Sequence, residues 1–267
     1  MSLHYHCPIC KLPLALNEKT LRCDNNHSFD FAKEGYVNLL PVQNKNSKQP
    51  GDSLEMVQAR RSFLEQGHYA FLQTALANLV KPLNANIVID LGCGEGFYTH
   101  AIANNTQATV YGVDISKSAV KYAAKRYKQC QFSVASISHA PFNDHLADVL
   151  ISVFAPLFDE ELSRLVKEDG CLVVASPGPM HLKELKKYIY NTVNEHTEVA
   201  TPTGFKQSSQ QLITEQVSLT FSDVRNLIMM TPFAWKFRPE HWQALEQKQH
   251  HKVTLSFYIS QFIKTAL

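Results

Sequence analysis

Three cysteines and one histidine near the start of the sequence have the spacing of a metal site. Cys7 and Cys10 form a C-x2-C pair, and Cys23 and His27 form a C-x3-H pair after a gap of twelve residues. Four such ligands complete the tetrahedron that zinc prefers and leave no position for water. The spacing therefore predicts a structural zinc site, and the alternative is a set of reduced thiols in a small core.

A glycine-rich loop in the string VIDLGCGEGFYTH is the second feature that could do chemistry. An apolar segment ends near Asp90, alternate glycines follow, and a helical pattern begins at Phe97. Glycines let the backbone approach a ligand closely, and the start of a helix is electropositive. A second apolar segment ends at Asp114, where a carboxylate can accept hydrogen bonds from both hydroxyls of a ribose. We expect a nucleoside-containing cofactor here.

The spacing of the loop separates two families of cofactor. The dinucleotide fingerprint is G-x-G-x-x-G, whereas this loop is G-x-G-x-G with an acid before the first glycine. The string from Asp90 to Gly96, followed by Asp114-Ile-Ser-Lys, resembles the Rossmann-like class I methyltransferases over roughly residues 84–180. The resemblance implies S-adenosylmethionine, with Asp90 supporting the loop. It assigns cofactor binding to Gly92, Gly94, Glu95 and Asp114.

Short apolar segments alternate with helical ones around this loop, which predicts a parallel sheet covered on both faces. The expected strands are 87–91, 110–113, 132–135, 149–154 and 171–176, with helices at 97–104, 116–127 and 159–167. An amphipathic helix from residue 60 to Pro82 precedes them. Beyond Pro179 we expect helices at 181–195, 223–230 and 240–247 and strands at 216–221 and 253–262. The predicted fold is α/β, a Rossmann-like methyltransferase sheet with a small N-terminal zinc-binding domain.

Composition is that of a globular protein with a sizeable core, because 45% of the residues are hydrophobic and 19% are charged. The polar string QNKNSKQPGDS predicts a linker. The expected division is a zinc-binding domain at 1–42, a linker at 43–59 and a methyltransferase domain at 60–267.

A cytoplasmic location is expected, with no membrane segment. The N-terminal residues lack the apolar core of a signal peptide, and the longest apolar run, 149–158, is too short to cross a bilayer. Thiols stay reduced in that compartment. Cys93, Cys130 and Cys171 are therefore predicted to be small core residues.

The positive charge is concentrated at the front of the chain. Residues 1–61 hold eight Lys/Arg and six Asp/Glu, whereas the remainder holds 18 of each. A zinc-held module with this surplus, joined to a methyltransferase, suits a large anionic substrate such as RNA.

Further strings narrow the resemblance. Two strings, FDFAKEGYVNLLP and GDSLEMVQARRSFLEQGHY, join the zinc knuckles to the glycine loop in one order, and DLGCGEGFYTH, SPGPMHLKELK and MTPFAW follow them. Together they resemble the bacterial 23S rRNA guanine-N1 methyltransferases over nearly the full chain. The resemblance implies zinc at the four ligands, a hairpin loop of 23S rRNA as substrate and a homodimer. It also implies cofactor contacts at Tyr69 and His181, which on the residues alone are a core aromatic and a helix-start histidine.

The group that removes the proton from guanine N1 is not assigned by the sequence. Glu160 and Glu161 follow the fourth strand of the sheet, but acids also favour the start of a helix for electrostatic reasons. By resemblance, Ser136 and Ile137 occupy the stretch that meets the adenine, and residues 154–156 either face the acceptor or form an apolar sheet edge.

RNA contacts also stay open at this stage. Arg60, Arg61, Lys45 and Lys48 are candidates for phosphate contacts or for a solvated surface. A C-terminal cluster either stacks on RNA bases or fills a core; it comprises Phe233, Trp235, Phe237 and Trp242, with Lys236 and Arg238. Two rival functions remain, a small-molecule methyltransferase with a zinc lid and a non-catalytic zinc-dependent RNA-binding protein.

Overall fold

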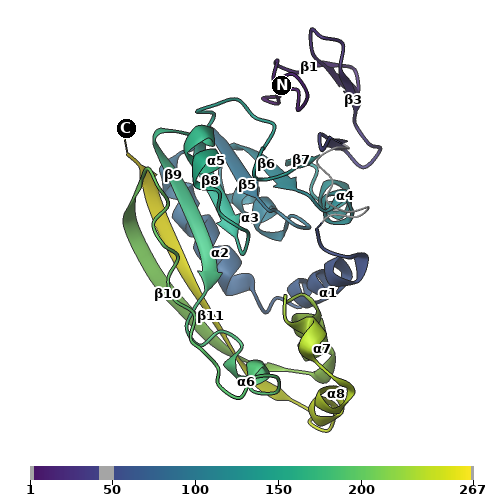
Figure 1. Cartoon of the computed structure of the whole chain (residues 1–267), viewed down its shortest axis with the longest axis vertical. Helices are drawn as coiled ribbons and strands as arrows, with labels where there is room; N and C mark the ends of the chain where they lie inside the picture. The colour runs from purple at the N-terminus through teal and green to yellow at the C-terminus, as the bar shows by residue number, and fades with distance from the viewer. Residues whose placement is uncertain (1–2, 42–50, 266–267) are drawn as a thin grey trace.

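A computed structural model describes residues 3–41 and 51–265 of the chain (Figure 1). Its centre is an eight-stranded sheet in the order β10-β11-β9-β8-β5-β6-β7-β4. The small N-terminal sheet β1-β2-β3 lies beyond the β7–β4 end, while the long strands β10 and β11 form the opposite edge. Among the described residues no helix combines the length and apolarity needed to cross a membrane.

Five parallel strands form the middle of the sheet, as the alternating pattern predicts. They are β5 (Ile87–Leu91), β6 (Thr109–Asp114), β7 (Gln131–Val134), β8 (Ala147–Val153) and β9 (Val166–Pro177). The helices between them are α3 (Phe97–Asn105), α4 (Lys117–Arg126) and α5 (Asp159–Leu165). The strands read as continuous apolar runs because helices cover both faces of a parallel sheet.

The N-terminal region contributes to this main sheet. Among the described strands, β1 (Ala15–Asn17), β2 (Thr20–Arg22) and β3 (Ser28–Asp30) pair only with one another, but β4 (Tyr36–Asn38) pairs in parallel with β7. Tyr5 also forms a bridge with Phe142, and their rings stack with centroids 5.1 Å apart. The buried rings hold the N-terminal segment against the sheet. The predicted boundary at residue 42 stays a prediction.

Two helices replace the single helix predicted from residue 60 to Pro82. They are α1 (Leu54–Glu65) and α2 (Ala70–Val80), followed by the short η2 (Lys81–Leu83). The break lies at Gly67, whose φ of 82° does not continue a right-handed helix. Ser53 caps α1, since its side chain accepts a hydrogen bond from the Met56 amide at 3.2 Å. Residues 54–59, expected as linker, are therefore helical.

An antiparallel hairpin completes the sheet. β10 (Phe205–Leu219) pairs with β11 (His251–Lys264), which pairs with β9. The excursion between them contains α7 (Phe221–Met229), η3 (Ala234–Lys236) and α8 (Pro239–Glu246). The strand predicted at 216–221 is the end of the much longer β10, whose remaining residues are mostly exposed and polar.

The helix predicted at 181–195 is wrong. Only α6 (Lys183–Lys186) is helical there, and residues 193–202 form irregular chain. The amphipathic pattern of the first turns gives way to Asn191-Thr-Val-Asn, residues that favour turns or strands over helices. This irregular segment lines a cavity beside the sheet.

Candidate active site and zinc centre

The glycine loop joins β5 to α3 in a conformation that requires glycine. Gly92, Gly94 and Gly96 have φ of 80°, 54° and 83°. A Cβ on Gly92 would stand 2.5 Å from the Cβ of Ala155. Left-handed backbone is costly for other residues, and this approach leaves no room for a side chain. The loop is therefore bent over the end of β5 and exposes its backbone to the space above.

Asp90 holds the loop from below, as the sequence predicts. The hydroxyl of Thr99 on α3 donates to Oδ2 of Asp90 at 2.6 Å. Oδ1 is buried and has no hydrogen-bond partner among the described residues. Burial raises the pKa of Asp90 to about 7, against the opposing hydrogen bond from Thr99.

Asp114 ends β6 and is hydrogen-bonded to the loop. The amide of Gly94 donates to Oδ2 at 2.9 Å, and the amide of Ser116 donates to Oδ1 at 2.7 Å. Burial raises the pKa of Asp114, while these two hydrogen bonds oppose the shift. Each carboxylate oxygen keeps a lone pair free for a second donor, which the paired hydroxyls of a ribose can supply.

Charged side chains also lie beside the loop, among them a buried glutamate. Glu95 is 8% exposed, and its Oε2 has no hydrogen-bond partner among the described residues. Burial raises the pKa of Glu95 to about 6, although the guanidinium of Arg60 opposes this. Arg60 itself forms an ion pair with Asp52. Sequence reasoning missed this pair; the string GDSLEMVQAR carries it, but nothing local indicates where the side chains point.

A cavity of about 400 Å³ lies above the loop. The predicted residues Tyr69, Gly92, Gly94, Glu95, Asp114, Ser136 and Ile137 all line it, together with Asp52, Arg60 and residues 153–156. His181 does not line this cavity; it lines the one next to it. The structure therefore brings together five of the six residues expected to bind cofactor.

The cavity fits S-adenosylmethionine by the chemistry of its donors. Asp114 can accept both ribose hydroxyls, and the unpaired Oε2 of Glu95 suits the ammonium of the methionine moiety. The loop backbone can approach such a ligand closely, because its glycines carry no side chain.

A second cavity of about 870 Å³ adjoins the first. The two share Asp52, Arg60, Tyr69, Phe154, Ala155, Pro156 and Met230. Phe154 has a φ of 58° and is 43% exposed, which is unusual for a large apolar residue. Phe154 lines both cavities, and a strained residue there indicates function, so the second cavity is the candidate acceptor site.

The four predicted zinc ligands converge. Their ligand atoms all lie within 4.8 Å of one another. Sγ of Cys7 and Sγ of Cys23 each lie 3.5 Å from Nδ1 of His27, and Sγ of Cys10 lies 3.6 Å from Sγ of Cys23. A zinc ion about 2.3 Å from each sulfur and about 2.0 Å from the nitrogen sets tetrahedral ligands about 3.5–3.8 Å apart. The cluster fits structural zinc.

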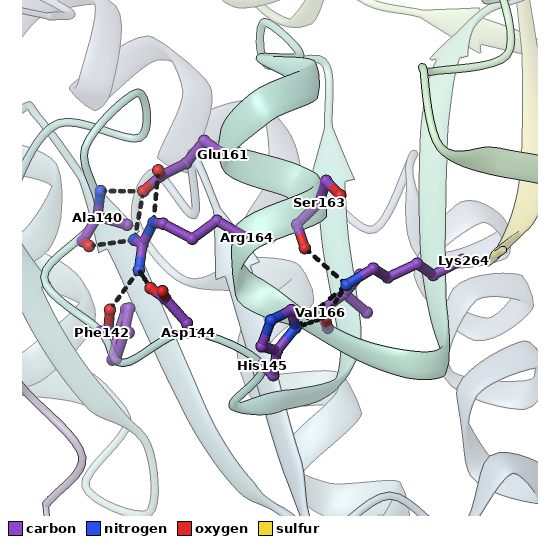
Figure 2. Close-up of polar contacts among 9 residues, drawn as sticks. All are labelled: Ala140, Phe142, Asp144, His145, Glu161, Ser163, Arg164, Val166 and Lys264. Atoms are coloured by element: carbon purple, nitrogen blue, oxygen red, sulfur yellow. Dashed lines mark hydrogen bonds and ion pairs between the residues drawn. The ribbon is translucent and has the colours of Figure 1, made fainter. Parts of the chain in front are cut away.

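The carboxylate of Glu161 is held by hydrogen bonds to Ala140 and Arg164 (Figure 2). Its carboxylate accepts the Ala140 amide at 2.6 Å and two nitrogens of Arg164, at 2.7 and 2.9 Å. Arg164 also contacts Asp144 at 2.7 Å. These contacts occupy the carboxylate, so Glu161 does not serve as the proton acceptor. Neither Glu160 nor Glu161 lines the described cavities.

The basic and aromatic candidates divide between site, surface and core. Arg61 lies over the ring of Tyr122, 4.4 Å from its centroid, while Lys45 and Lys48 lie outside the described residues. Phe237 is buried, and Phe233 and Trp242 pack on the core. Trp235 is 79% exposed. Only part of the predicted aromatic cluster is therefore available for stacking.

Comparison with known proteins supports both the zinc site and the methyltransferase fold. Residues 5–48 match a zinc-ribbon family described as "RlmA, N-terminal", and residues 84–253 match a family described as "Methyltransferase domain". A 23S rRNA (guanine(748)-N(1))-methyltransferase of Streptomyces fradiae is 31% identical over 95% of this chain and 94% of its own length. A Bacillus subtilis protein with a provisional 23S rRNA (guanine-N(1)-)-methyltransferase designation is 29% identical over 94% of both chains.

Other methyltransferases match a smaller part of the chain. A malonyl-[acyl-carrier protein] O-methyltransferase of Legionella pneumophila is 26% identical over 42% of this chain and 43% of its own. The glycine loop, its acids and the Cys3His cluster define an S-adenosylmethionine-dependent class I methyltransferase with an N-terminal zinc ribbon. Within that class, the chain belongs to the 23S rRNA (guanine-N1)-methyltransferase family.

Proposed function

We propose that this protein transfers a methyl group from S-adenosylmethionine to N1 of a guanine in a hairpin loop of 23S rRNA. The observation that carries the proposal is the full-length match to guanine-N1 methyltransferases, zinc ribbon included. A small-molecule enzyme with a zinc lid is disfavoured, because the metabolite-type relative matches less than half of the chain. A non-catalytic binder is disfavoured by the intact loop and Asp114.

Two adjoining cavities suit a reaction between two bound partners. The cofactor supplies an activated methyl group in the cavity above the glycine loop, and the chain holds the guanine in the cavity beside it. We propose that Phe154, exposed at the boundary, stacks on the unpaired base. Fixing both partners in line supplies much of the rate acceleration, and a loop guanine is cheaper to present than a paired one.

A surface groove next to the acceptor cavity is a proposed path for the RNA strand. It is lined by Lys187, Tyr188, Ile189, Tyr190, Asn191, Trp235, Lys236, Arg238 and His241. Tyr190 lines both the groove and the acceptor cavity, and Nζ of Lys236 lies 4.2 Å from the centroid of its ring. An exposed tryptophan among cations suits a nucleotide chain.

Binding measurements test the groove. Trp235→Ala removes a stacking platform and should weaken binding of a 23S rRNA hairpin by about 1–3 kcal/mol. Lys236→Ala should lower the slope of log affinity against log salt by about 1. Lys206→Ala, an exposed change on β10, is the control and should leave both quantities unchanged. Unaltered binding by Trp235→Ala and Lys236→Ala contradicts the path.

We further propose a homodimer and a cytoplasmic location, where rRNA is available. β10 is fifteen residues long and pairs with β11 on one side only among the described strands. An unpaired strand edge can bind a second chain. Sedimentation at equilibrium should give twice the chain mass of 30.2 kDa, and the mass of a monomer contradicts this part of the proposal.

Methyl transfer to purified RNA tests the reaction itself. Protein with labelled cofactor should methylate 23S rRNA from cells that lack the gene, and should leave 16S rRNA unlabelled. Asp114→Ala should abolish the transfer while RNA binding persists, because the carboxylate acts on the cofactor. Absence of label in 23S rRNA, with folded and zinc-loaded protein, overturns the proposal.

A further inference from the structure

Three basic side chains line the acceptor cavity, and of these only His181 is expected, by resemblance, to contact the cofactor. His181 lies just before α6, Lys186 is the last residue of α6, and His196 lies on the irregular segment beyond it. Nζ of Lys186 lies 2.5 Å from Nε2 of His196. Lys186 is 8% exposed, which is rare for a lysine without a paired acid.

The electrostatic surroundings keep the two imidazoles neutral. Burial lowers the pKa of His196, and the charge of Lys186 lowers it further. Burial, Lys186 and His196 together lower the pKa of His181 to about 3. The other charged groups on the described lining are Asp52 and Arg60, which pair with each other. Lys186 therefore has no carboxylate partner among the lining residues.

The Lys186–His196 pair is complementary to the edge of guanine. That edge presents O6, a hydrogen-bond acceptor, beside N1–H, a donor. The pair presents an ammonium, which only donates, beside an imidazole nitrogen that accepts. Adenine presents an amino donor beside an unprotonated N1, which is the opposite arrangement. A buried ammonium without an anion also suits the negative charge that O6 gains when N1 loses its proton.

We propose that Lys186 and His196 bind the Watson–Crick edge of the target guanine and remove its N1 proton; this rests on the proposed function. Nζ of Lys186 donates to O6, which frees Nε2 of His196 for the N1 proton. The N1–H bond breaks first, since the same in-plane lone pair then bonds to the methyl carbon. As that bond forms, the carbon–sulfur bond breaks and its electron pair stays on sulfur. His196 afterwards releases the proton to water.

Single-turnover methylation of a 23S rRNA hairpin at several pH values tests this role. His196→Ala should lower the rate at neutral pH by about 100-fold or more, the usual contribution of a positioned base. Its rate should then rise about tenfold per pH unit as guanine ionises in solution, whereas the native rate is flat because His196 is already neutral. Added imidazole should partly rescue His196→Ala. Lys186→Met should show a similar loss without rescue by imidazole.

Matched variants separate chemistry from folding. His196→Gln keeps a hydrogen bond to Lys186 but cannot take a proton. Its methylation rate should therefore fall as far as that of His196→Ala. His250→Ala and Lys183→Met alter an exposed histidine and a half-buried lysine of α6 outside the described cavities, and should keep the native rate. All variants should bind S-adenosylmethionine with native affinity, because none of the changed residues lines the cofactor cavity.

Two outcomes are distinguishable. If the native protein transfers no methyl group to guanine N1, the proposed function fails. In the other outcome, the native protein methylates guanine N1 while folded His196→Gln keeps the native rate and the flat pH profile. In that case the function stands and the assignment of His196 and Lys186 is overturned.

Discussion

At the scale of single residues, the cofactor site depends on buried carboxylates with different tasks. Asp90 braces the loop through Thr99, Asp114 accepts two backbone amides, and Glu95 keeps an oxygen unpaired among the described residues. Burial raises the pKa of all three, to about 7 for Asp90 and about 6 for Glu95, so the charge of these two near neutral pH is sensitive to what binds. A cationic ligand favours the ionised forms.

The pH dependence of cofactor binding tests the role of Glu95. Because burial raises its pKa to about 6, Glu95 is mostly ionised at pH 7 and mostly protonated at pH 5. Protonation removes the charge that attracts the ligand ammonium, so affinity for S-adenosylmethionine should fall about tenfold from pH 7 to pH 5. Calorimetry on Glu95→Gln should show a smaller fall in affinity, since a glutamine side chain does not titrate. Equal pH dependence in both proteins refutes this role.

The sequence predicts the loop residues but not their neighbours across the cavity. Gly92, Glu95 and Asp114 lie in strings whose local spacing carries the geometry. Arg60 and Asp52 reach the cavity from α1 and the residue before its cap, and their ion pair depends on tertiary packing. The resemblance implies that His181 contacts the cofactor; His181 lines the neighbouring cavity, where its ring packs on Phe257 of β11 with centroids 4.7 Å apart, and the cofactor contact stays a prediction.

At the scale of elements, the β5–α3 turn determines whether the cavity exists. Gly92→Ala introduces a Cβ 2.5 Å from that of Ala155 and strains a backbone with φ of 80°. Gly67→Ala is a matched control, since φ is 82° but no described residue beyond its two chain neighbours has an atom within 4 Å of the added Cβ.

Denaturant unfolding should separate the two changes. Gly67→Ala should lower the free energy of unfolding by about 1 kcal/mol, from left-handed strain alone. Gly92→Ala should lower the free energy of unfolding by about 1–3 kcal/mol more, because the added Cβ overpacks the turn. It should also abolish cofactor binding. Equal losses for the two variants contradict the close packing of this turn.

The central elements were predicted well because each is buried and apolar over its length. β5 matches its predicted bounds of 87–91, and β6 and β9 extend beyond their predicted ranges. β7 and β8 begin slightly earlier than predicted and end one residue earlier. β10 was missed over most of its length because exposed Gln and Ser residues carry no apolar alternation. β4 was missed because three residues give no period, and only pairing with β7 stabilises them.

At the scale of the whole molecule, the zinc ribbon is packed against the catalytic domain. Tyr5 contacts Phe142 and Tyr111, whose ring centroids lie 5.1 and 5.5 Å away, and β4 extends the sheet beside β7. The described residues that line the cofactor cavity nevertheless all come from Gly51 onwards. Zinc should therefore matter more for the RNA than for the cofactor.

Loss of a zinc ligand tests this division. Cys10→Ala should lose zinc and unfold the ribbon, since structural zinc supplies about 10 kcal/mol or more of folding free energy in isolated modules. RNA affinity should fall at least about tenfold, or about 1.4 kcal/mol, while affinity for S-adenosylmethionine stays native. Cys171→Ala, a buried thiol outside the cluster, should keep both affinities. Native RNA binding by zinc-free Cys10→Ala refutes a role of the ribbon in recognition.

The identity of the methylated nucleoside tests the central claim most directly. 23S rRNA treated with the protein and S-adenosylmethionine is digested to nucleosides, and the products are separated and identified by mass spectrometry. The account predicts N1-methylguanosine, at one residue per rRNA molecule, in a hairpin loop. A methyl group on another atom of guanine, on another base or on a ribose contradicts it.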